Sequence, residues 1–198
     1  KWDMNRIFSD YYSKHLPPHR QKEVAHRYMM GLYRLMKTVT ERFPYILFEG
    51  CASGGMRMDY KTLSEFSLVS ISDQTQYLKC PYIVGNILIG ALPEQAAVWS
   101  FPFGNDCKTP EEVSDNRITM NIINTFPGRL YLSSRLWMLD AHQLSIVKEG
   151  VDYYNSLSEM KKRAVPCFPN GFTRFGDTTV CAGLKDRNKV YLALWTLM

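Results

Sequence analysis

The sequence lacks several features that would assign it to a broad class at once. It has no apolar run near the roughly 20 residues of a membrane-spanning helix, and it opens with no basic and apolar leader. The five cysteines are an odd number without CxxC spacing, which disfavours a zinc site or a disulfide framework and favours a reducing, cytoplasmic compartment. The net charge of +5 is scattered among acidic residues, so no basic stripe indicates nucleic acid binding. We therefore expect neither nucleic acid nor membrane as a partner.

What is present is an ordinary globular composition, with 45% hydrophobic and 22% charged residues in a chain of 198. This length fits one good-sized domain, or most of one domain with the start of another. The chain begins without an initiator methionine, inside the motif-like segment KWDMNR. We interpret the sequence as a piece of a longer protein.

Strand-like and helix-like segments alternate along residues 1–165. Short β-branched and aromatic runs predict strands at residues 45–48, 68–72, 97–101 and 130–132. Periodic apolar segments with capping residues or prolines predict helices at residues 19–43, 60–66, 82–92, 110–126 and 140–163. Thr109 is the predicted N-cap of the fourth helix. The repeat of strand, loop and helix predicts a parallel α/β fold.

The first predicted helix has an apolar face that we expect to be buried. Its members share a helical period, and they are Val24, Tyr28, Leu32, Leu35, Met36 and Val39.

Residues 1–165 supply about five strand–helix units, which we interpret as part of a (β/α)₈ barrel. A doubly wound open sheet is the alternative, but Gly54-Gly55 lacks the GxGxxG frame of its dinucleotide loop. After residue 165 the pattern alternates and predicts a hairpin, residues 179–184 and 189–194. We therefore expect a partial catalytic barrel at 1–165 and the start of a C-terminal β-sandwich domain at 166–198.

Reactive side chains follow three successive predicted strands. Asp3 follows the first, a loop with Cys51 and Arg57 follows the second, and Asp73 follows the third. Because the C-terminal strand ends meet at the mouth of a barrel, the two carboxylates can face each other there. Such a pair can split an acetal, one carboxylate attacking the anomeric carbon and the other protonating the leaving oxygen, at about 5–5.5 Å in retaining enzymes.

Plainer interpretations of the same residue types stay open. Asp73 could be the N-cap of the helix after it, Glu49 is a rival carboxylate that could simply organise its loop, and Cys51 as a thiol nucleophile lacks a histidine in its loop. We interpret Trp99 and Trp137 as core residues rather than sugar platforms. Four other aspartates are interpreted as cap or turn residues: Asp10, Asp59, Asp106 and Asp115. The histidines lack metal-ligand spacing: His15, His19, His26 and His142.

Taken together, the three segments resemble the α-galactosidases, or melibiases, of glycoside hydrolase family 36. That family shows K-W-D-x-N-R, then C-x-S-G-G-x-R, then S-D-x-T, and these motifs occur in that order at residues 1–6, 51–57 and 72–75. A weaker likeness continues to residue 163. The resemblance implies a (β/α)₈ barrel present as roughly strands 4 to 8. It also implies a retaining hydrolase that removes terminal α-galactosyl residues from oligosaccharides without a metal or organic cofactor, and it allows a homo-oligomer.

The resemblance also implies roles for the two aspartates. Asp3 corresponds to the nucleophile and Asp73 to the general acid/base. Lys1 corresponds to a residue that hydrogen-bonds sugar hydroxyls, and its ammonium would help to keep Asp3 ionised.

In the second motif, Cys51, Ser53 and Gly54 correspond to a wall that faces the galactose. A glycine at that position lets the backbone approach the sugar closely. Arg57 corresponds to a further binding residue, with bracing of the loop as the alternative.

Three positions depart from the family segment W-T-S-D-N-T-D. Ser70 stands where the tryptophan would line the pocket, and Gln74 and Gln76 replace the asparagine and aspartate. The alternatives are therefore an α-glycosidase or transglycosidase with another sugar preference, or a non-catalytic sugar-binding remnant. We expect the isolated chain to be inactive, because a barrel closes only when all eight strands pair.

Overall fold

The computed structural model describes residues 1–3, 11–187 and 189–197. The chain divides into two compact units, Lys1–Val69 and Ser70–Met198. Asp10 and the end of the first motif, residues 4–6, lie outside the described residues. Across the described ranges, no helix is both long enough and apolar enough to cross a lipid bilayer.

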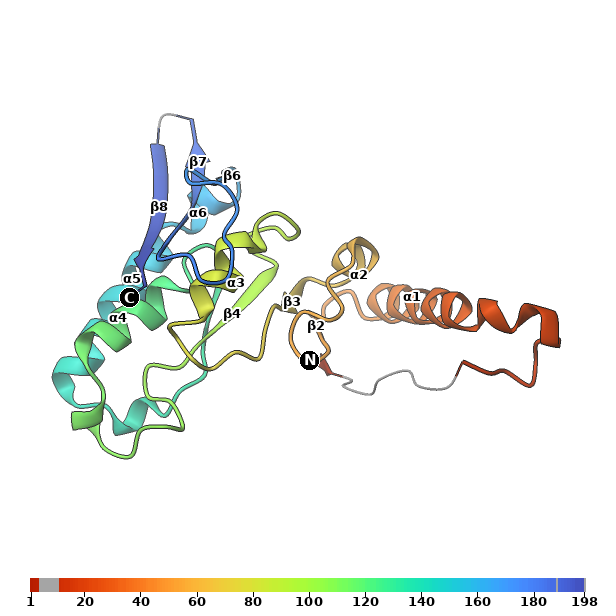
Figure 1. The fold of residues 1–198 in the computed structure, drawn as a ribbon, viewed down its shortest axis with the longest axis horizontal. Helices are drawn as coiled ribbons and strands as arrows, with labels where there is room; N and C mark the ends of the chain where they lie inside the picture. The colour runs from red at the N-terminus through yellow and green to blue at the C-terminus, as the bar shows by residue number, and fades with distance from the viewer. Residues whose placement is uncertain (4–10, 188, 198) are drawn as a thin grey trace. The chain divides into compact units, whose positions relative to one another are not determined.

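The first unit packs a long helix and a short helix against three short strands (Figure 1). Its core joins Leu32 and Met36 of the long helix to Phe66, whose ring lies 5.9 Å from the rings of Trp2 and Phe48. The elements are β1 (Trp2–Asp3), the 3₁₀ helix η1 (Pro18–Glu23), α1 (Val24–Arg42), β2 (Glu49–Cys51), α2 (Tyr60–Glu65) and β3 (Leu68–Ser70).

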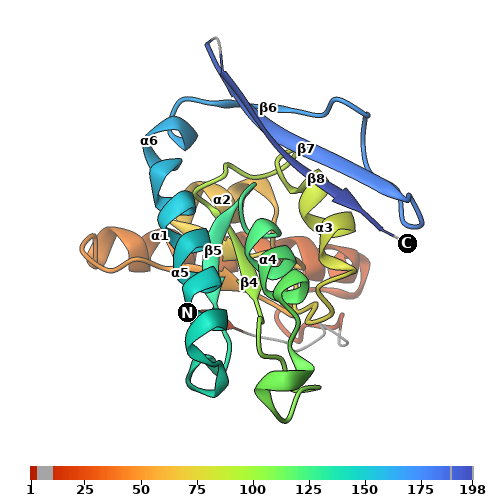
Figure 2. The same ribbon diagram turned by 90° about the vertical axis from the view of Figure 1, so that its left-hand side faces the viewer.

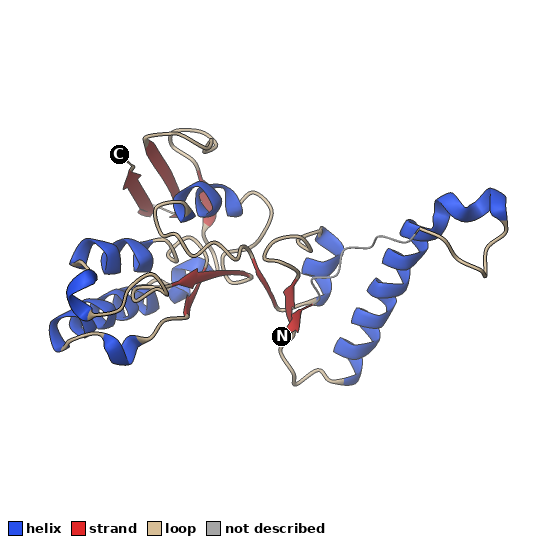
Figure 3. Cartoon of the chain, turned by 60° about the horizontal axis from the view of Figure 1, so that its bottom comes forward, coloured by secondary structure: helices blue, strands red, loops and turns tan. Residues whose placement is uncertain are grey.

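Two predictions for this unit are wrong. Residues 45–48 form no strand and lie in the loop between α1 and β2 (Figure 3). A turn after Pro44, closed by the bond from Ile46 N to Phe43 O, holds this run outside the sheet and leaves Tyr45 79% exposed. The α-helix begins at Val24, after η1, and Tyr28 and Leu35 of its predicted apolar face are 40% and 50% exposed.

The second unit contains the last two strands of the parallel sheet and all of a second, antiparallel sheet. Besides the end of β3, its elements are α3 (Cys80–Ile87), β4 (Ala96–Ser100), η2 (Pro110–Glu112), α4 (Asp115–Ile123), β5 (Arg129–Leu132), η3 (Leu136–Met138), α5 (Ala141–Ser156), α6 (Ser158–Lys161), β6 (Val165–Cys167), β7 (Thr179–Asp186) and β8 (Lys189–Thr196).

The strands of the parallel sheet follow one another in sequence order, β1-β2-β3-β4-β5. The pairs β1·β2, β2·β3 and β4·β5 are parallel. Sequential order is the arrangement of a (β/α)₈ barrel, whereas a doubly wound sheet reverses its order at a switch point. The predicted partial barrel followed by an antiparallel β segment is therefore confirmed.

Helices α4 and α5 run beside β4 and β5 and cover one face of these strands (Figure 2). The core on this side includes Ile118 and Ile122 of α4 and Val147 of α5, with Leu130 and Leu132 of β5 packed against it. Because side chains alternate along a strand, the residues between these leucines point to the opposite face.

Three predicted helices in this unit have wrong boundaries. The helix predicted at residues 82–92 is α3, Cys80–Ile87, and ends at Ile87 rather than at residue 92. Thr109 precedes the 3₁₀ helix η2 and makes no side-chain cap bond to it. The N-cap of α4 is Ser114, five residues after Thr109, and its Oγ accepts from Arg117 N. The predicted helix 140–163 is interrupted at Leu157, whose N–H bonds to the carbonyl of Tyr154 three residues back, a tighter turn than the α-helix.

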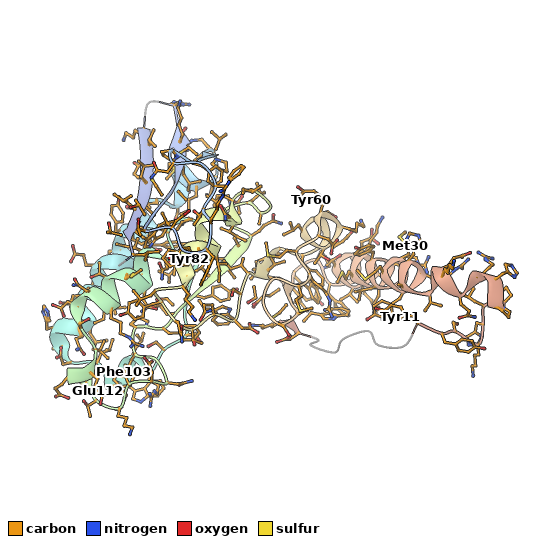
Figure 4. All side chains as sticks on the ribbon, viewed as in Figure 1. Tyr11, Met30, Tyr60, Tyr82, Phe103 and Glu112 are labelled. Atoms are coloured by element: carbon orange, nitrogen blue, oxygen red, sulfur yellow. The ribbon has the colours of Figure 1, made fainter. Side chains whose placement is uncertain are left out.

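The antiparallel sheet has the order β6-β7-β8, and the predicted hairpin is confirmed as β7 and β8. Helix α3 packs against this sheet and its connecting loop. Tyr82, labelled in Figure 4, donates its hydroxyl to Asp177 O at 3.0 Å, and Asn86 exchanges two hydrogen bonds with the backbone of Thr173. The boundary at residues 165 and 166 between two domains stays a prediction.

Lys161, the last residue of α6, is a buried cation that is 6% exposed. Its ammonium donates to Gly128 O at 2.7 Å and lies 3.8 Å from the centre of the Tyr154 ring. Burial lowers the pKa of Lys161 to about 7, because desolvation penalises the charged form.

We expect Lys161 to make the protein more stable as the pH rises from about 7 to about 10. In this window the lysine of the unfolded chain stays protonated while the folded one is neutral. The unfolded state therefore binds more protons, and its formation becomes less favourable by at most on the order of 1 kcal/mol per pH unit. Urea unfolding of the full-length protein and of Lys161→Met should diverge progressively with pH. Lys148→Met, at an exposed lysine of α5, should keep the wild-type slope. Parallel slopes for wild type and Lys161→Met would contradict the expectation.

Candidate active site

The first strand presents Asp3 at its C-terminal end, exposed and paired in register with Cys51 of β2. Lys1, at the other side of Trp2, places its Nζ 3.4 Å from Glu49 Oε1. The Glu49 side chain is only 14% exposed, so this ion pair keeps a buried carboxylate next to a cation. Glu49 therefore orients Lys1 through this ion pair, whereas its interpretation as the residue that organises the loop after β2 stays a prediction.

The loop after β2 folds back on itself. Ser53 and Gly54 both have left-handed backbones, with φ of 45° and 71°. This conformation is strained for serine and ordinary for glycine. Arg57 Nη1 donates to Cys51 O at 3.3 Å, which matches the interpretation that this arginine braces the loop.

Cys51 is the buried end of β2 and only 2% exposed. A thiol nucleophile needs access to substrate and an adjacent base. The burial of Cys51 therefore weighs against the thiol interpretation. Contacts of Cys51, Ser53, Gly54 and Arg57 with a sugar stay predictions.

Asp73 lies in the irregular segment after β3 and is exposed. Its interpretation as the N-cap of the next helix is wrong, because α3 begins at Cys80 with Lys79 at the N-cap. Short turns surround it: Ser72 Oγ accepts from Gln74 N at 3.1 Å, and Gln74 Oε1 accepts from Gln76 N at 3.0 Å. The side chain of Gln74 is thus bound to the backbone of Gln76, and the neighbouring Asp73 caps no helix.

The predicted site residues fall into two groups. Lys1, Asp3 and the loop 51–57 belong to the first unit, where β1 and β2 bring Asp3 and Cys51 side by side. Asp73 belongs to the second unit. The pairing of Asp3 with Asp73 as two catalytic carboxylates stays a prediction.

Two aspartates have the plainer role that the sequence predicted. Asp59 caps α2, accepting from the backbone of Lys61 and Thr62, and Asp106 lies in a turn, where it forms two hydrogen bonds with Arg117. The interpretation of Asp115 as a cap or turn residue is wrong, because Ser114 is the N-cap of α4 and Asp115 is its first helical residue. Asp115 lies 2.9 Å from His142 Nε2 and, by accepting a hydrogen bond, raises the pKa of that histidine. Within the described ranges no three potential metal ligands lie together.

The two tryptophan predictions need correction. Trp137 is 77% exposed and not a core residue. Trp99 is only partly buried, and its indole Nε1 donates to Ser70 Oγ on the neighbouring strand at 2.7 Å. The sequence holds no local signal for this contact, because the two residues are 29 positions apart.

The sequential order of the parallel sheet defines the chain as part of a (β/α)₈ barrel. Enzymes of this fold build their active sites at the C-terminal ends of the strands, which is where the reactive side chains of this chain lie. Residues 1–84 match the family model Melibiase. The chain is 53% identical over 75 residues to the α-galactosidase AgaA of Geobacillus stearothermophilus, a match that covers 38% of this chain and 10% of AgaA. These findings show that residues 1–84 are similar to the α-galactosidases of glycoside hydrolase family 36, which confirms the resemblance.

Solved structures extend the likeness beyond the matched sequence. A variant of AgaA in complex with raffinose superposes with a TM-score of 0.75 and 25% identity, covering 92% of this chain and 25% of AgaA. The α-galactosidase from Lactobacillus brevis superposes over 98% of this chain and 26% of its own, with a TM-score of 0.80 and 23% identity, which shows the fold alone. The sequence match thus spans about a tenth of AgaA, and the superpositions span about a quarter of each solved chain.

Proposed function

We propose that a full-length protein carrying this chain is a retaining exo-α-galactosidase. One observation carries the proposal: every predicted site residue, from Lys1 to Asp73, falls inside the segment 1–84 that matches the Melibiase family. The raffinose complex of AgaA supports oligosaccharides with a terminal α-galactosyl residue as the substrate class. The activity needs no metal or organic cofactor in this proposal.

In the proposed first step, Asp3 attacks the anomeric carbon of the galactosyl unit as its glycosidic bond breaks, and Asp73 donates a proton to the leaving oxygen. In the second step, Asp73 as a carboxylate removes a proton from water, which attacks the same carbon and releases Asp3. Two inversions at one carbon give net retention of configuration. Exposure of Asp3 at the end of β1 suits a nucleophile that must be ionised and reach the sugar.

The proposed sugar contacts come from the first unit. The ion pair with Glu49 holds the ammonium of Lys1 beside β1, from where it can donate to sugar hydroxyls. The left-handed turn at Ser53 and Gly54 leaves Ser53 exposed and Gly54 buried, and the bond from Arg57 to Cys51 O ties the loop to the end of β2.

The proposal also includes the domain boundaries, the cellular compartment and a second candidate activity. We propose residues 1–165 as the partial barrel and 166–198 as the beginning of a β-sandwich domain. Cytoplasmic localisation is proposed because all five cysteines are free thiols. The departures at Ser70, Gln74 and Gln76 make a related α-glycosidase or transglycosidase the second candidate, and the buried Ser70 is the observation that favours it.

The test is a panel of nitrophenyl glycosides assayed with the full-length protein. We expect the α-galactoside to be hydrolysed at least about tenfold faster than the α-glucoside and the α-N-acetylgalactosaminide, which would place about 1.4 kcal/mol or more of transition-state discrimination in the sugar pocket. Nuclear magnetic resonance at early times should detect α-galactose as the first product. Preference for another α-glycoside would support the second candidate. Hydrolysis of no α-glycoside would contradict both and favour a non-catalytic sugar-binding remnant.

A further inference from the structure

A tryptophan, a tyrosine and a serine lie on one face of β3, β4 and β5. Trp99 of β4 pairs in register with Tyr131 of β5, so their side chains share a face, and their rings meet edge to face at 5.1 Å. On the other side of Trp99, its Nε1 donates to Ser70 Oγ of β3 at 2.7 Å. Phe101, two residues further along the chain, stacks at 6.4 Å.

This face is the one that the helices leave uncovered. Leu130 and Leu132, which alternate with Tyr131, pack into the core with α4 and α5. Val98, next to Trp99, is 2% exposed, whereas Trp99 is partly exposed. In a (β/α)₈ barrel the face away from the helices is the interior, and its upper end is the floor of the active site.

Trp99 also stands at the catalytic end of its strand. It is the fourth of the five residues of β4, Ala96–Ser100, so its ring lies near the C-terminal edge of the sheet. Ser70 ends β3, and Asp73 follows three residues later. The indole therefore belongs to the strand next to the proposed acid/base.

We propose that Trp99 is the aromatic wall on which the galactosyl ring packs, and that Ser70 is the positioning residue that orients its indole. The proposal rests on the proposed function. The apolar C–H face of a galactose suits an aromatic ring, and a tryptophan offers the largest such surface. Ser70 occupies the position where the resembling family has its pocket tryptophan, and the indole of the neighbouring strand lies against it.

The hydrogen bond explains why serine fits at position 70. An indole has one donor and no acceptor, so a partner on β3 fixes the tilt of the ring about its own axis. The edge of Tyr131 restrains the ring from the other side. A ring held by one hydrogen bond and by its contacts with Tyr131 and Phe101 keeps its remaining surface in a defined orientation, which is what a stacking wall requires.

The experiment compares Trp99→Ala, Trp99→Phe and Ser70→Ala with wild type in the full-length protein. For the nitrophenyl α-galactoside we expect kcat/KM to fall about tenfold or more in Trp99→Ala, mainly through KM, and about threefold in the other two variants. Calorimetric titration with galactose should show parallel losses of affinity. Trp137→Ala, at the exposed tryptophan of the same unit, is the matched control and should change neither quantity.

Each outcome bears on the wall or on the proposed function separately. If Trp99→Ala melts early but keeps wild-type KM and galactose affinity per folded molecule, Trp99 is a packing residue and the inference is overturned. If Trp99→Ala fails to fold, Trp99→Phe and Ser70→Ala decide it, and unchanged KM and affinity in both overturn it. If wild type hydrolyses no α-glycoside but binds galactose, and Trp99→Ala weakens that binding, the proposed function is contradicted and the role of Trp99 as the wall is supported. Wild type that neither hydrolyses nor binds galactose would overturn both.

Discussion

Replacing Asp3 with alanine should lower kcat for an aryl α-galactoside by about 10³-fold or more in the full-length protein, because no other group forms the glycosyl-enzyme. The substitution also opens space at the end of β1, where Asp3 is exposed. A small anion such as azide should enter this space and attack the anomeric carbon from the same side. Azide should therefore restore turnover and yield β-galactosyl azide, which product analysis by nuclear magnetic resonance identifies.

Glu49→Ala is the matched control for this nucleophile, since Glu49 is the other carboxylate beside Lys1. Removing it deletes the ion pair that holds Lys1, so a moderate loss of activity is expected without any rescue by azide. A β-galactosyl azide from Glu49→Ala, together with normal turnover by Asp3→Ala, would exchange the two assignments.

Replacing Asp73 with alanine should produce a loss that depends on the leaving group. A proton from a positioned acid contributes about 10²–10⁴-fold when the leaving oxygen is basic, as in an oligosaccharide. A dinitrophenyl leaving group needs no proton. For that substrate, kcat/KM of Asp73→Ala should therefore stay within about tenfold of wild type. The measurement is kcat/KM for raffinose, nitrophenyl and dinitrophenyl α-galactosides, together with its pH profile.

The pH profile provides an independent check on the same residue. Because the acid must be protonated for the first step, the alkaline fall of kcat/KM in wild type should disappear in Asp73→Ala. Glu49→Ala should keep the alkaline fall. If Glu49→Ala instead showed the leaving-group pattern while Asp73→Ala was normal, Asp73 would not be the acid.

The parts of the fold that could be predicted are those with local signals. The β7–β8 hairpin follows from two alternating runs around a polar turn, and the proline and cap residues locate the helices to within a few positions. The strand predicted at 45–48 fails because an aromatic and apolar run is equally compatible with a loop, and only the turn after Pro44 decides between them. The exposed Tyr28 and Leu35 show that a helical period identifies a face without fixing how much of it is covered.

The candidate site divides along the same line. Asp3, the loop 51–57 and Asp73 are short motifs that follow strands, so their order alone was informative. Trp99 could not be assigned in that way, because its partner Ser70 is brought to it only by pairing of neighbouring strands. Lys161 is another such case, since its burial depends on the carbonyl of Gly128, 33 positions away.

The carbonyl oxygen of Gly128 joins two side chains below the barrel sheet, away from the proposed site. It accepts from Lys161 at 2.7 Å and from the hydroxyl of Tyr154 at 3.3 Å, and a side chain at Gly128 would collide with Ala96 O. These contacts lie at the N-terminal end of β5. Trp99 lies near the C-terminal end of β4, and Asp73 follows the C-terminal end of β3. We therefore expect substitutions in the proposed sugar pocket to leave the contacts of Gly128 intact. The unit can accumulate new specificities at one edge while the other edge preserves its fold, a division that makes such a scaffold evolvable.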